Sequence, residues 1–214
     1  EENIIRKRNV VGIQVEIVDP EYVKLVVDTT VKYKSALTEK TANELKAEVI
    51  DTIHDFGLAE INTFDKKFRY SKLLSAIDLT DNSIQGNVTT VKLKSSFEPN
   101  LSETQQYIIQ FFNPIDVNGS TLASTSFTYN SFVCYFDDDR AGNVRIYRLL
   151  DNVKKIVKSI AGTINYSTGK IILNNFQPQA VPSDGYIHLT VIPATHDINS
   201  VQKGILIIEE EDIS

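Results

Sequence analysis

The sequence predicts an α+β fold in which a small helix-on-sheet unit is followed by a β-rich unit of the sandwich or barrel type. Before Phe97, two stretches with helical spacing alternate with strand-like stretches, which is typical of helices packed on one sheet face. After Phe97, short strand-like stretches separated by turn residues favour a sandwich or barrel. We therefore expect two domains, residues 1–97 and 98–214, and leave open that the last strand packs back on the first domain.

The first unit begins with two strand-like stretches. Apolar and polar residues alternate in Val10–Val18, as they do in a strand with one buried face. Asp19-Pro20 interrupts this pattern and indicates a turn. Tyr22–Tyr33 is rich in Val, Thr and Tyr, which suit a pleated and half-buried surface, and it predicts the second strand.

A helix is expected after these strands. Thr41 and Glu44 have the spacing of a capping box, and Thr38 is an alternative cap one turn earlier. Gly57 is expected to end the helix in a left-handed conformation. One apolar stripe at helical spacing predicts the buried face of this helix: Ala42, Leu45, Val49, Ile53 and Phe56.

A shorter helix and a further strand complete the first unit. Phe64 and Phe68 flank a charged turn. Ser71 is the expected cap of a short helix that continues through Leu73, Leu74 and Ile77. The alternating stretch Val88–Leu93 predicts a strand.

The second unit is predicted to consist of strands. Turn signals lie between them at Asn118-Gly119, Ala141-Gly142-Asn143 and Asp184-Gly185. The expected strands are Gln106–Phe112, Thr121–Tyr129, Phe132–Phe136, Val144–Leu149, Val153–Ile160, Ile164–Tyr166, Lys170–Leu173, Tyr186–Ile192 and Ile205–Ile208.

The stretch GTINYSTGKIIL, Gly162–Leu173, could be a phosphate-binding loop or a plain hairpin. A phosphate-binding loop leads into a helix N-terminus, where backbone N–H groups bind the anion. Here an apolar strand follows instead, and Ser167-Thr168-Gly169 supplies turn residues, with Gly169 able to adopt a positive φ. The stretch therefore predicts a β-hairpin with a structural role.

Length and composition indicate a globular protein without a transmembrane helix. The chain has 214 residues, 42% of them hydrophobic, and no apolar run near the roughly 20 residues that span a bilayer. The N-terminus lacks the apolar core of a signal peptide.

The net charge of the chain is −6, and basic residues are grouped only at Arg6-Lys7-Arg8, which argues against nucleic-acid binding. Because the chain contains no Met, even at position 1, we expect it to be a fragment.

We assign no catalytic, cofactor-binding or metal-binding residue, and expect no cofactor and no enzymatic activity. The sequence contains no Walker loop, dinucleotide fingerprint, GxSxG elbow or HExxH motif. His54, His188 and His196 lie in unrelated segments, without Cys, Asp or Glu at metal-ligand spacing. We expect His54 on the helix surface and His188 on the solvated face of a strand.

Two further candidates for chemistry are Asp137-Asp138-Asp139 and Cys134. The aspartates lie near Gly142, but the D-x-D-x-D-G spacing of a calcium loop and its closing Glu are missing. We expect an exposed hairpin turn there. Cys134 lies among strand-like apolar residues, so we expect a buried structural thiol. A single cysteine forms no internal disulfide and fits a reducing compartment.

Several stretches carry a family resemblance when they are taken in order. The first three stretches are VVGIQVEIVDPEYVKLVVDTTVKY, TANELKAEVIDTIHDFG and YSKLLSAIDLTDNSI. The last two are FDDDRAGNVRIYRL (Phe136–Leu149) and GTINYSTGKIIL. The last two resemble the C-terminal part of the large baseplate wedge subunit of T4-like contractile-tailed phages. The first three resemble the baseplate J-like core of that family. The resemblance covers nearly the whole chain, and the order of the motifs is more specific than any one of them.

The resemblance implies a structural virion protein without catalysis. It implies that each wedge contains two copies, which bind each other and a neighbouring wedge subunit. It also implies contacts between these subunits that join the wedges into a ring around the tail hub. The implied partners are a second copy, as a homodimer, and neighbouring wedge subunits, with no nucleic acid and no membrane. The implied location is the tail baseplate of a virion that assembles in the host bacterial cytoplasm. Interface residues stay unassigned.

Two other functions remain open. A carbohydrate- or receptor-binding β module of a phage tail would use the Tyr- and Asn-containing turns of the second unit, although the chain has no Trp for stacking on sugars. A hydrolase with an unrecognised site would rest on Asp137–Asp139 and Cys134 alone.

Overall fold

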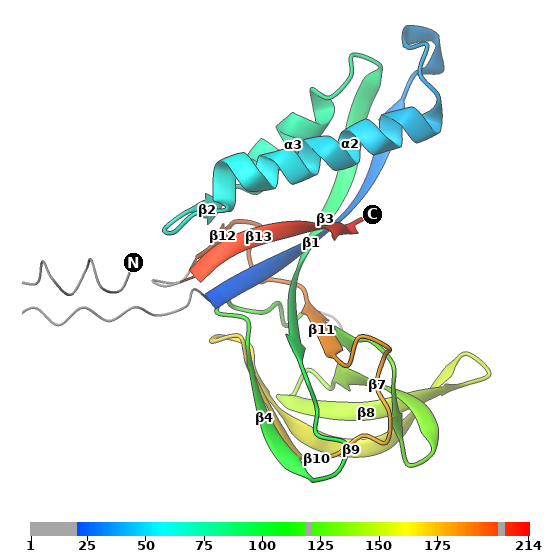
Figure 1. Cartoon of the computed structure of the whole chain (residues 1–214), viewed down its shortest axis with the longest axis vertical. Coiled ribbons are helices and arrows are strands. Elements are labelled where there is room, and N and C mark those ends of the chain that lie inside the picture. Colours follow the sequence, from blue (N-terminus) through cyan, green and yellow to red (C-terminus); the bar gives the residue numbers. More distant parts are fainter. Residues whose placement is uncertain (1–20, 119–120, 201–203) are drawn as a thin grey trace, which may run out of the picture.

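A computed structural model describes residues 21–118, 121–200 and 204–214. Its architecture is α+β, as predicted, with helices at one end of the molecule and a curved β-sheet at the other (Figure 1). The predicted strand Val10–Val18 and the basic triplet Arg6-Lys7-Arg8 lie outside the described residues. No helix of the described residues is both long and apolar enough to cross a membrane.

A five-stranded sheet joins segments from both parts of the chain. Its centre is the antiparallel pair β1 (Glu21–Tyr33) and β3 (Ile84–Phe97). β13 (Gly204–Ile213) runs parallel to the outer side of β1, and β11 (Ile187–Val191) runs antiparallel to β3. β5 (Ala123–Ser124) completes the order β13-β1-β3-β11-β5. The chain after residue 98 therefore supplies three strands of this sheet.

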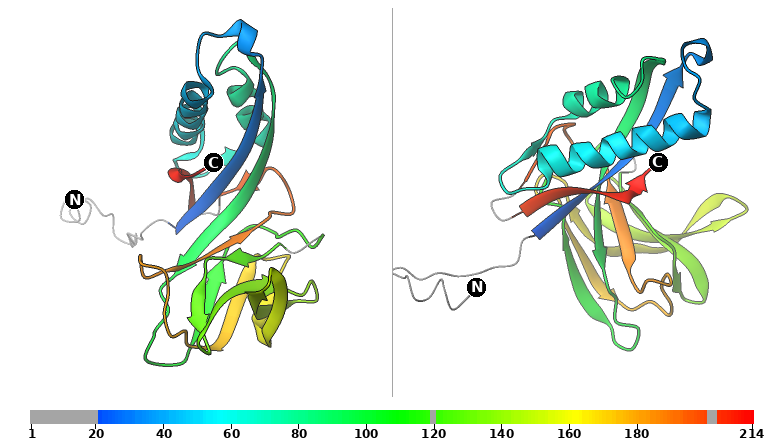
Figure 2. Two further views of the ribbon diagram at one scale, coloured as in Figure 1. Left: turned by 90° about the vertical axis from the view of Figure 1, so that its right-hand side faces the viewer. Right: turned by 45° about the horizontal axis from the view of Figure 1, so that its top comes forward.

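Helices α2 (Ala42–Phe56) and α3 (Tyr70–Asp78) lie together on one side of this sheet (Figures 1 and 2). The predicted capping box of α2 is confirmed, because the Thr41 side chain accepts from the Glu44 N–H and the Glu44 carboxylate accepts from the Thr41 N–H. Ala42 of the predicted stripe is exposed. The other four residues of the stripe are buried: Leu45, Val49, Ile53 and Phe56. A short 3-10 helix, η1 (Ser35–Leu37), precedes α2.

Gly57 does not end α2 in a left-handed conformation, which corrects the prediction. Its φ of −56° and ψ of −50° are helical, and the chain continues into a π-helix, η2 (Gly57–Ile61). A Cβ added at Gly57 would lie 3.3 Å from Cβ of Ile208, so the glycine lets the helix approach β13 closely.

Ser71 does not cap α3, which corrects a second prediction. Arg69 is the N-cap residue and its side chain forms no capping hydrogen bond. The Tyr70 N–H instead donates to Oδ1 of Asp197 at 3.1 Å. The cap therefore comes from a residue far along the chain, which local spacing cannot indicate.

The second sheet has six antiparallel strands, in the order β4-β10-β9-β8-β7-β6. Their bounds are β4 Gln105–Gln110, β6 Phe127–Tyr129, β7 Phe132–Asp138, β8 Asn143–Leu150, β9 Val153–Asn165 and β10 Lys170–Phe176. A small third sheet pairs β12 (Ile198–Asn199) with β2 (Lys67–Phe68). The described residues between 105 and 200 contain no helix.

Two strand predictions need correction. The expected strand Thr121–Tyr129 is divided into β5 and β6, which belong to different sheets. The expected strands Val153–Ile160 and Ile164–Tyr166 are one continuous strand, β9. The hairpin predicted for GTINYSTGKIIL is confirmed, with Ile164 opposite Ile171 in the β9–β10 pair.

Phe176 lies at the centre of the contact between the two large sheets. It is fully buried, and its ring centroid lies 5.0 Å from that of Phe136 and 5.2 Å from that of Phe127. Phe97, at the end of β3, lies 6.3 Å from it on the side of the five-stranded sheet. Packed aromatic rings thus hold the two sheets in a fixed relation.

Candidate interaction surface

Asp137 and Asp138 are buried, which corrects the prediction of an exposed aspartate turn. They are 1% and 2% exposed. The Arg145 guanidinium binds Asp137 through two hydrogen bonds, Nε to Oδ1 at 3.0 Å and Nη2 to Oδ2 at 2.9 Å. Lys154 Nζ adds a third at 3.1 Å. Buried carboxylates of this kind need paired charges and donors, and Asp137 has both.

Asp138 joins three segments of the β-rich part. Its Oδ1 accepts the N–H groups of Thr121 and Leu122 at 3.1 and 3.0 Å, and its Oδ2 accepts the Tyr166 hydroxyl at 2.7 Å. Burial and the neighbouring Asp138 carboxylate raise the pKa of Tyr166 above its ordinary value. Tyr166, the first residue of the β9–β10 turn, therefore has a structural role.

Asp139 is the member of the triplet that forms the turn. Its Oδ1 accepts the N–H groups of Ala141 and Asn143 at 2.8 and 2.9 Å. Burial opposes its charged form, but the hydrogen bonds from Asn143 and Ala141 outweigh burial and lower the pKa of Asp139. Each of the three aspartates therefore has its own set of protein donors.

Cys134 is a buried thiol, as predicted. It is 0% exposed and lies in β7 among the apolar residues of the core. Burial raises the pKa of the Cys134 thiol, so little of the nucleophilic thiolate forms. The residue serves packing.

A Ser–His–Asp series lies at the surface, and sequence reasoning missed it. Ser96 Oγ lies 2.6 Å from Nδ1 of His188, and Asp184 Oδ2 lies 2.6 Å from its Nε2. Ser96 and His188 are opposite each other in the β3–β11 pair, far apart in sequence. Because Ser96 and Asp184 are exposed, water competes for these contacts, and we interpret the series as a cross-strand surface contact. The hydrogen bond from His188 lowers the pKa of Asp184.

Three carboxylates of β13 gather on an irregular stretch of that strand: Glu209, Glu211 and Asp212. Leu25 pairs with Ile208 and Val27 pairs with Ile213, so the residues between Ile208 and Ile213 bulge from the ladder. Lys94 Nζ lies 2.6 Å from Oδ1 of Asp212, and Lys24 Nζ lies 2.7 Å from Oε2 of Glu209. Two lysines thus neutralise much of this cluster.

The ends of β8 and β9 project from the curved sheet as a two-stranded ribbon, at the right of Figure 1. We call this ribbon, residues 147–156, the β8–β9 arm. β7 pairs with β8 only as far as Tyr147, and β10 pairs with β9 only from Gly162 onward. Asp151 and Asn152 have φ values of 51° and 60°, as a two-residue hairpin turn of type I′ requires.

The arm carries apolar side chains that are half exposed. The exposed fractions are 49% for Leu149, 47% for Leu150, 53% for Val153 and 46% for Ile156. Leu150 and Val153 are paired on one face of the ribbon, and Leu149 and Ile156 lie on the other, so both faces expose apolar groups of the kind that mark protein–protein contacts.

The arm is also basic. Residues 145–158 contain five basic residues and one acidic residue, in a chain of net charge −6. The Arg148 guanidinium lies 3.9 Å from the ring centroid of Phe132, and Lys154 Nζ lies 4.3 Å from that of Tyr147. Cation–π contacts of this kind hold the side chains on the ribbon.

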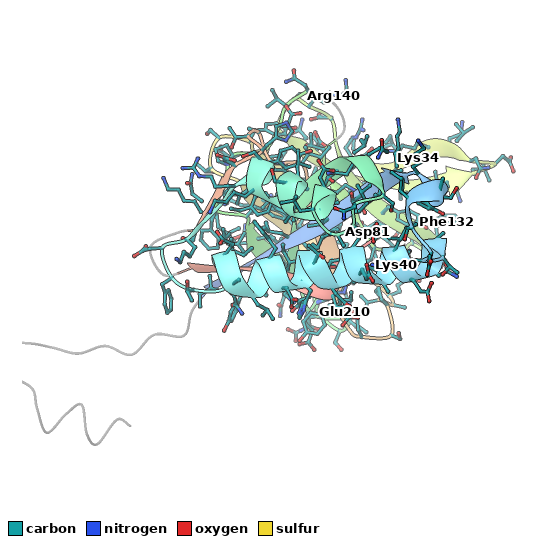
Figure 3. All side chains as sticks on the ribbon, turned by 90° about the horizontal axis from the view of Figure 1, so that it is seen from above. Lys34, Lys40, Asp81, Phe132, Arg140 and Glu210 are labelled. Carbon is teal, nitrogen blue, oxygen red and sulfur yellow. The ribbon has the colours of Figure 1, made fainter. Side chains whose placement is uncertain are left out.

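The helices at the opposite end carry a second surface, which we call the helical layer and define as α2, η2 and α3. A groove of about 410 Å³ lies between them and is lined in part by Phe56, Ala76 and Leu79. Leu58 and Leu79 are 52% and 84% exposed. Figure 3 looks down on this layer, with the Lys40–Asp81 ion pair, 2.9 Å long, at its edge.

The helical layer has the opposite charge to the arm. Residues 44–60 contain five acidic residues and one lysine. Asp51 and Asp55 are exposed on α2, and no lysine or arginine in the described part of the chain forms an ion pair with them. Local amphipathic spacing predicted the buried face of α2, but neither the groove nor the arm was predicted, because exposure of apolar residues is a tertiary property.

Comparison with known proteins links this architecture to phage baseplates. Residues 21–95, which hold β1, the helical layer and most of β3, match the family model described as baseplate structural protein gp6, C-terminal domain III. The chain is 25% identical over 183 residues to the baseplate wedge protein gp6 of Enterobacteria phage T4. That alignment covers 82% of this chain and 27% of the relative, so the chain spans about a quarter of the relative's length. The chain is thus similar to a phage baseplate wedge protein over most of its length, and to gp6 C-terminal domain III in its first part.

Proposed function

We propose that this chain is a structural component of a contractile phage tail baseplate wedge and resides in the virion. The observation that carries the proposal is a similarity to a baseplate wedge protein that extends over 82% of the chain and so includes both the helical layer and the curved sheet. The match of residues 21–95 to a gp6 domain supports the same role. The baseplate J-like assignment of the first unit is part of this proposal.

In this role the chain mediates dimerisation and the joining of wedges into the ring around the tail hub. Its partners are a second copy and neighbouring wedge subunits. Two features support an assembly role: a well-packed core that holds the two sheets rigidly, and exposed apolar residues on both the arm and the helical layer. Rigid modules with apolar surface patches are suited to protein–protein contact.

Self-association is expected to be isologous, with the same surface used by both copies around a two-fold axis. A contact that is stable outside the virion buries about 1,200–2,000 Å² in total. Sedimentation velocity across a concentration series tests the proposal, and a dimer is the expected result. A strictly monomeric mass up to about 100 μM, well above micromolar affinity, would contradict it. Glycan-array binding by the same protein would favour the receptor-binding alternative.

We also propose that residues 1–97 and 98–214 form two units, with β5, β11 and β13 of the second unit joined to the sheet of the first. The stretch 101–104 between β3 and β4 is exposed and outside any strand, so it is the expected first site of limited proteolysis. A first cut elsewhere among the described residues would contradict this division.

A further inference from the structure

We propose that the β8–β9 arm of one copy docks on the helical layer of a second copy, and that a two-fold pair makes this contact twice. This inference rests on the proposed self-association and names the surfaces that form it. The occupant of each surface is therefore the other surface, in a second copy of this chain.

The two surfaces match in charge and in polarity. Residues 145–158 around the arm carry five basic residues and one acidic residue, and residues 44–60 of the helical layer carry five acidic residues and one basic residue. Each surface also exposes apolar side chains, such as Leu150 and Val153 on the arm and Leu58 and Leu79 on the layer. Complementary potentials guide and align such contacts, and the apolar contacts supply the buried area.

Some of these charges already have partners within the chain, since Arg145 and Lys154 bind Asp137, and Glu48 and Glu60 bind Lys40 and Lys72, but the others remain available for a second copy. Arg148, Lys155 and Lys158 form no ion pair with any carboxylate in the described ranges of the chain. Asp51 and Asp55 are likewise available on α2. This distinguishes them from the acidic stretch of β13, where Lys24 and Lys94 already bind the carboxylates.

The arm and the layer of a single copy do not meet. The helical layer lies at one end of the molecule and the six-stranded sheet with its arm at the other, in both views of Figure 2 as in Figure 1. Arm-to-arm pairing would bring like charges together, which is unfavourable. The matching surfaces can therefore meet only between copies.

A two-fold pair satisfies both surfaces of both copies at once. The arm of the first copy reaches the layer of the second, and the arm of the second reaches the layer of the first, so the assembly closes at two. Head-to-tail repetition of a single contact would instead leave a free arm and a free layer at the ends. The arm is held by its two-residue turn and by the contact of Arg148 with Phe132, so docking orders few additional groups.

Charge reversal with complementation tests the proposal. Lys155→Glu with Lys158→Glu takes the net charge of residues 145–158 from +4 to 0, and Asp51→Lys with Asp55→Lys takes that of residues 44–60 from −4 to 0. Each double variant alone loses the charge complementarity of both contacts in its dimer, so its dimer dissociation constant should rise more than about tenfold. An equimolar mixture should recover a heterodimer, because one contact joins the unchanged arm to the unchanged layer and the other brings the new carboxylates of the arm to the new lysines of the layer. Lys32→Glu with Lys34→Glu, on exposed residues outside both surfaces, is the matched control and should dimerise like the unaltered chain.

The outcomes separate this inference from the proposed function. A monomeric unaltered chain would overturn self-association and this inference together. If the unaltered chain dimerises and the two charge-changed double variants dimerise equally well, this inference alone is overturned. A mixture that recovers masses far above a dimer would overturn the two-fold form. Circular dichroism of each variant verifies that the fold is intact, and dimerisation of the unaltered chain should weaken with added salt.

Discussion

The Tyr166 hydroxyl donates a hydrogen bond to Oδ2 of Asp138, 2.7 Å away, and so joins the β9–β10 turn to the end of β7. Asp138 is 2% exposed and also accepts two backbone N–H groups. One carboxylate thus fixes three segments that are far apart in sequence. The tyrosine in GTINYSTGKIIL and the aspartates in FDDDRAGNVRIYRL belong to one structural cluster.

Tyr166→Phe is expected to destabilise the fold by about 1.5–3 kcal/mol, the usual contribution of a hydrogen bond to a charged group. Urea unfolding at neutral pH measures the loss. Tyr147→Phe is the matched control, because the Tyr147 hydroxyl has no hydrogen-bond partner among the described residues. Equal stability of the two variants would show that the Tyr166 contact contributes nothing.

The triplet Asp137–Asp139 is expected to bind no calcium tightly. Arg145 and Lys154 neutralise Asp137, and backbone groups and Tyr166 occupy the oxygens of Asp138. A cation would have to displace these donors, at the cost of leaving them unpaired. Titration calorimetry with calcium chloride should give no binding heat. Micromolar affinity that disappears in Asp139→Ala would overturn this prediction.

Phe56→Ala is expected to cost about 3–5 kcal/mol of unfolding free energy, as does the loss of other buried phenylalanine rings. Phe56 is 9% exposed, and its ring meets Phe68 edge to face at 6.2 Å. Asn43→Ala, on the exposed first turn of α2, is the control and should change stability little. A loss below about 1 kcal/mol for Phe56→Ala would mean that the ring is not a core residue.

Sequence reasoning succeeded where the cause is local. The capping box at Thr41 and the stripe of α2 depend on residues within a few turns, and both are present. It failed at Gly57 because the reason for that glycine is Ile208, on a strand from the other end of the chain. It failed at Asp138 for the same reason, since Thr121 and Tyr166 are brought to it only by the fold.

The arm shows a different limit of sequence reasoning. Leu149 and Leu150 lie on opposite faces of β8, and each is about half exposed, so period-two alternation does not describe this part of the strand. Apolar residues on both faces would ordinarily indicate a strand buried on both sides. The hairpin leaves the sheet instead, and only the pairing of β7 and β10 with their neighbours shows where it does so.

Gly162→Ala is expected to disrupt the β9–β10 pair. A Cβ at this position would lie 2.1 Å from the backbone oxygen of Ile172, and a backbone atom in a sheet cannot move aside cheaply. Gly57→Ala is the informative comparison, because its Cβ would meet only the Ile208 side chain, at 3.3 Å. Thermal unfolding should show a much larger loss for Gly162→Ala. Similar melting temperatures for the two variants would contradict the close approach at Gly162.

Part of the loss of unfolding free energy at acid pH should come from Asp81, and this part should disappear in Asp81→Asn. The hydrogen bond from Lys40 and then the Ser83 N–H lower the pKa of Asp81 from 3.8 to about 2. Because the folded pKa is depressed, this contribution is fully present above the unfolded pKa and is lost as the pH falls through the folded pKa. The window is therefore from about pH 4 down to about pH 2.

Unfolding free energies of the unaltered chain and of Asp81→Asn should differ at about pH 5 and converge towards about pH 2, because other carboxylates titrate alike in both proteins. When Lys40→Gln is introduced into both proteins, the difference in unfolding free energy caused by Asp81→Asn at about pH 5 should become smaller, since Lys40 is the largest cause of the pKa shift. Lys40 also binds Glu48 at 2.7 Å, so Glu48→Gln is needed to separate the two ion pairs. A difference in unfolding free energy between the unaltered chain and Asp81→Asn that stayed constant from about pH 5 to about pH 2 would show that titration of Asp81 does not contribute to stability. The Lys40–Asp81 contact would then be an ion pair without energetic effect.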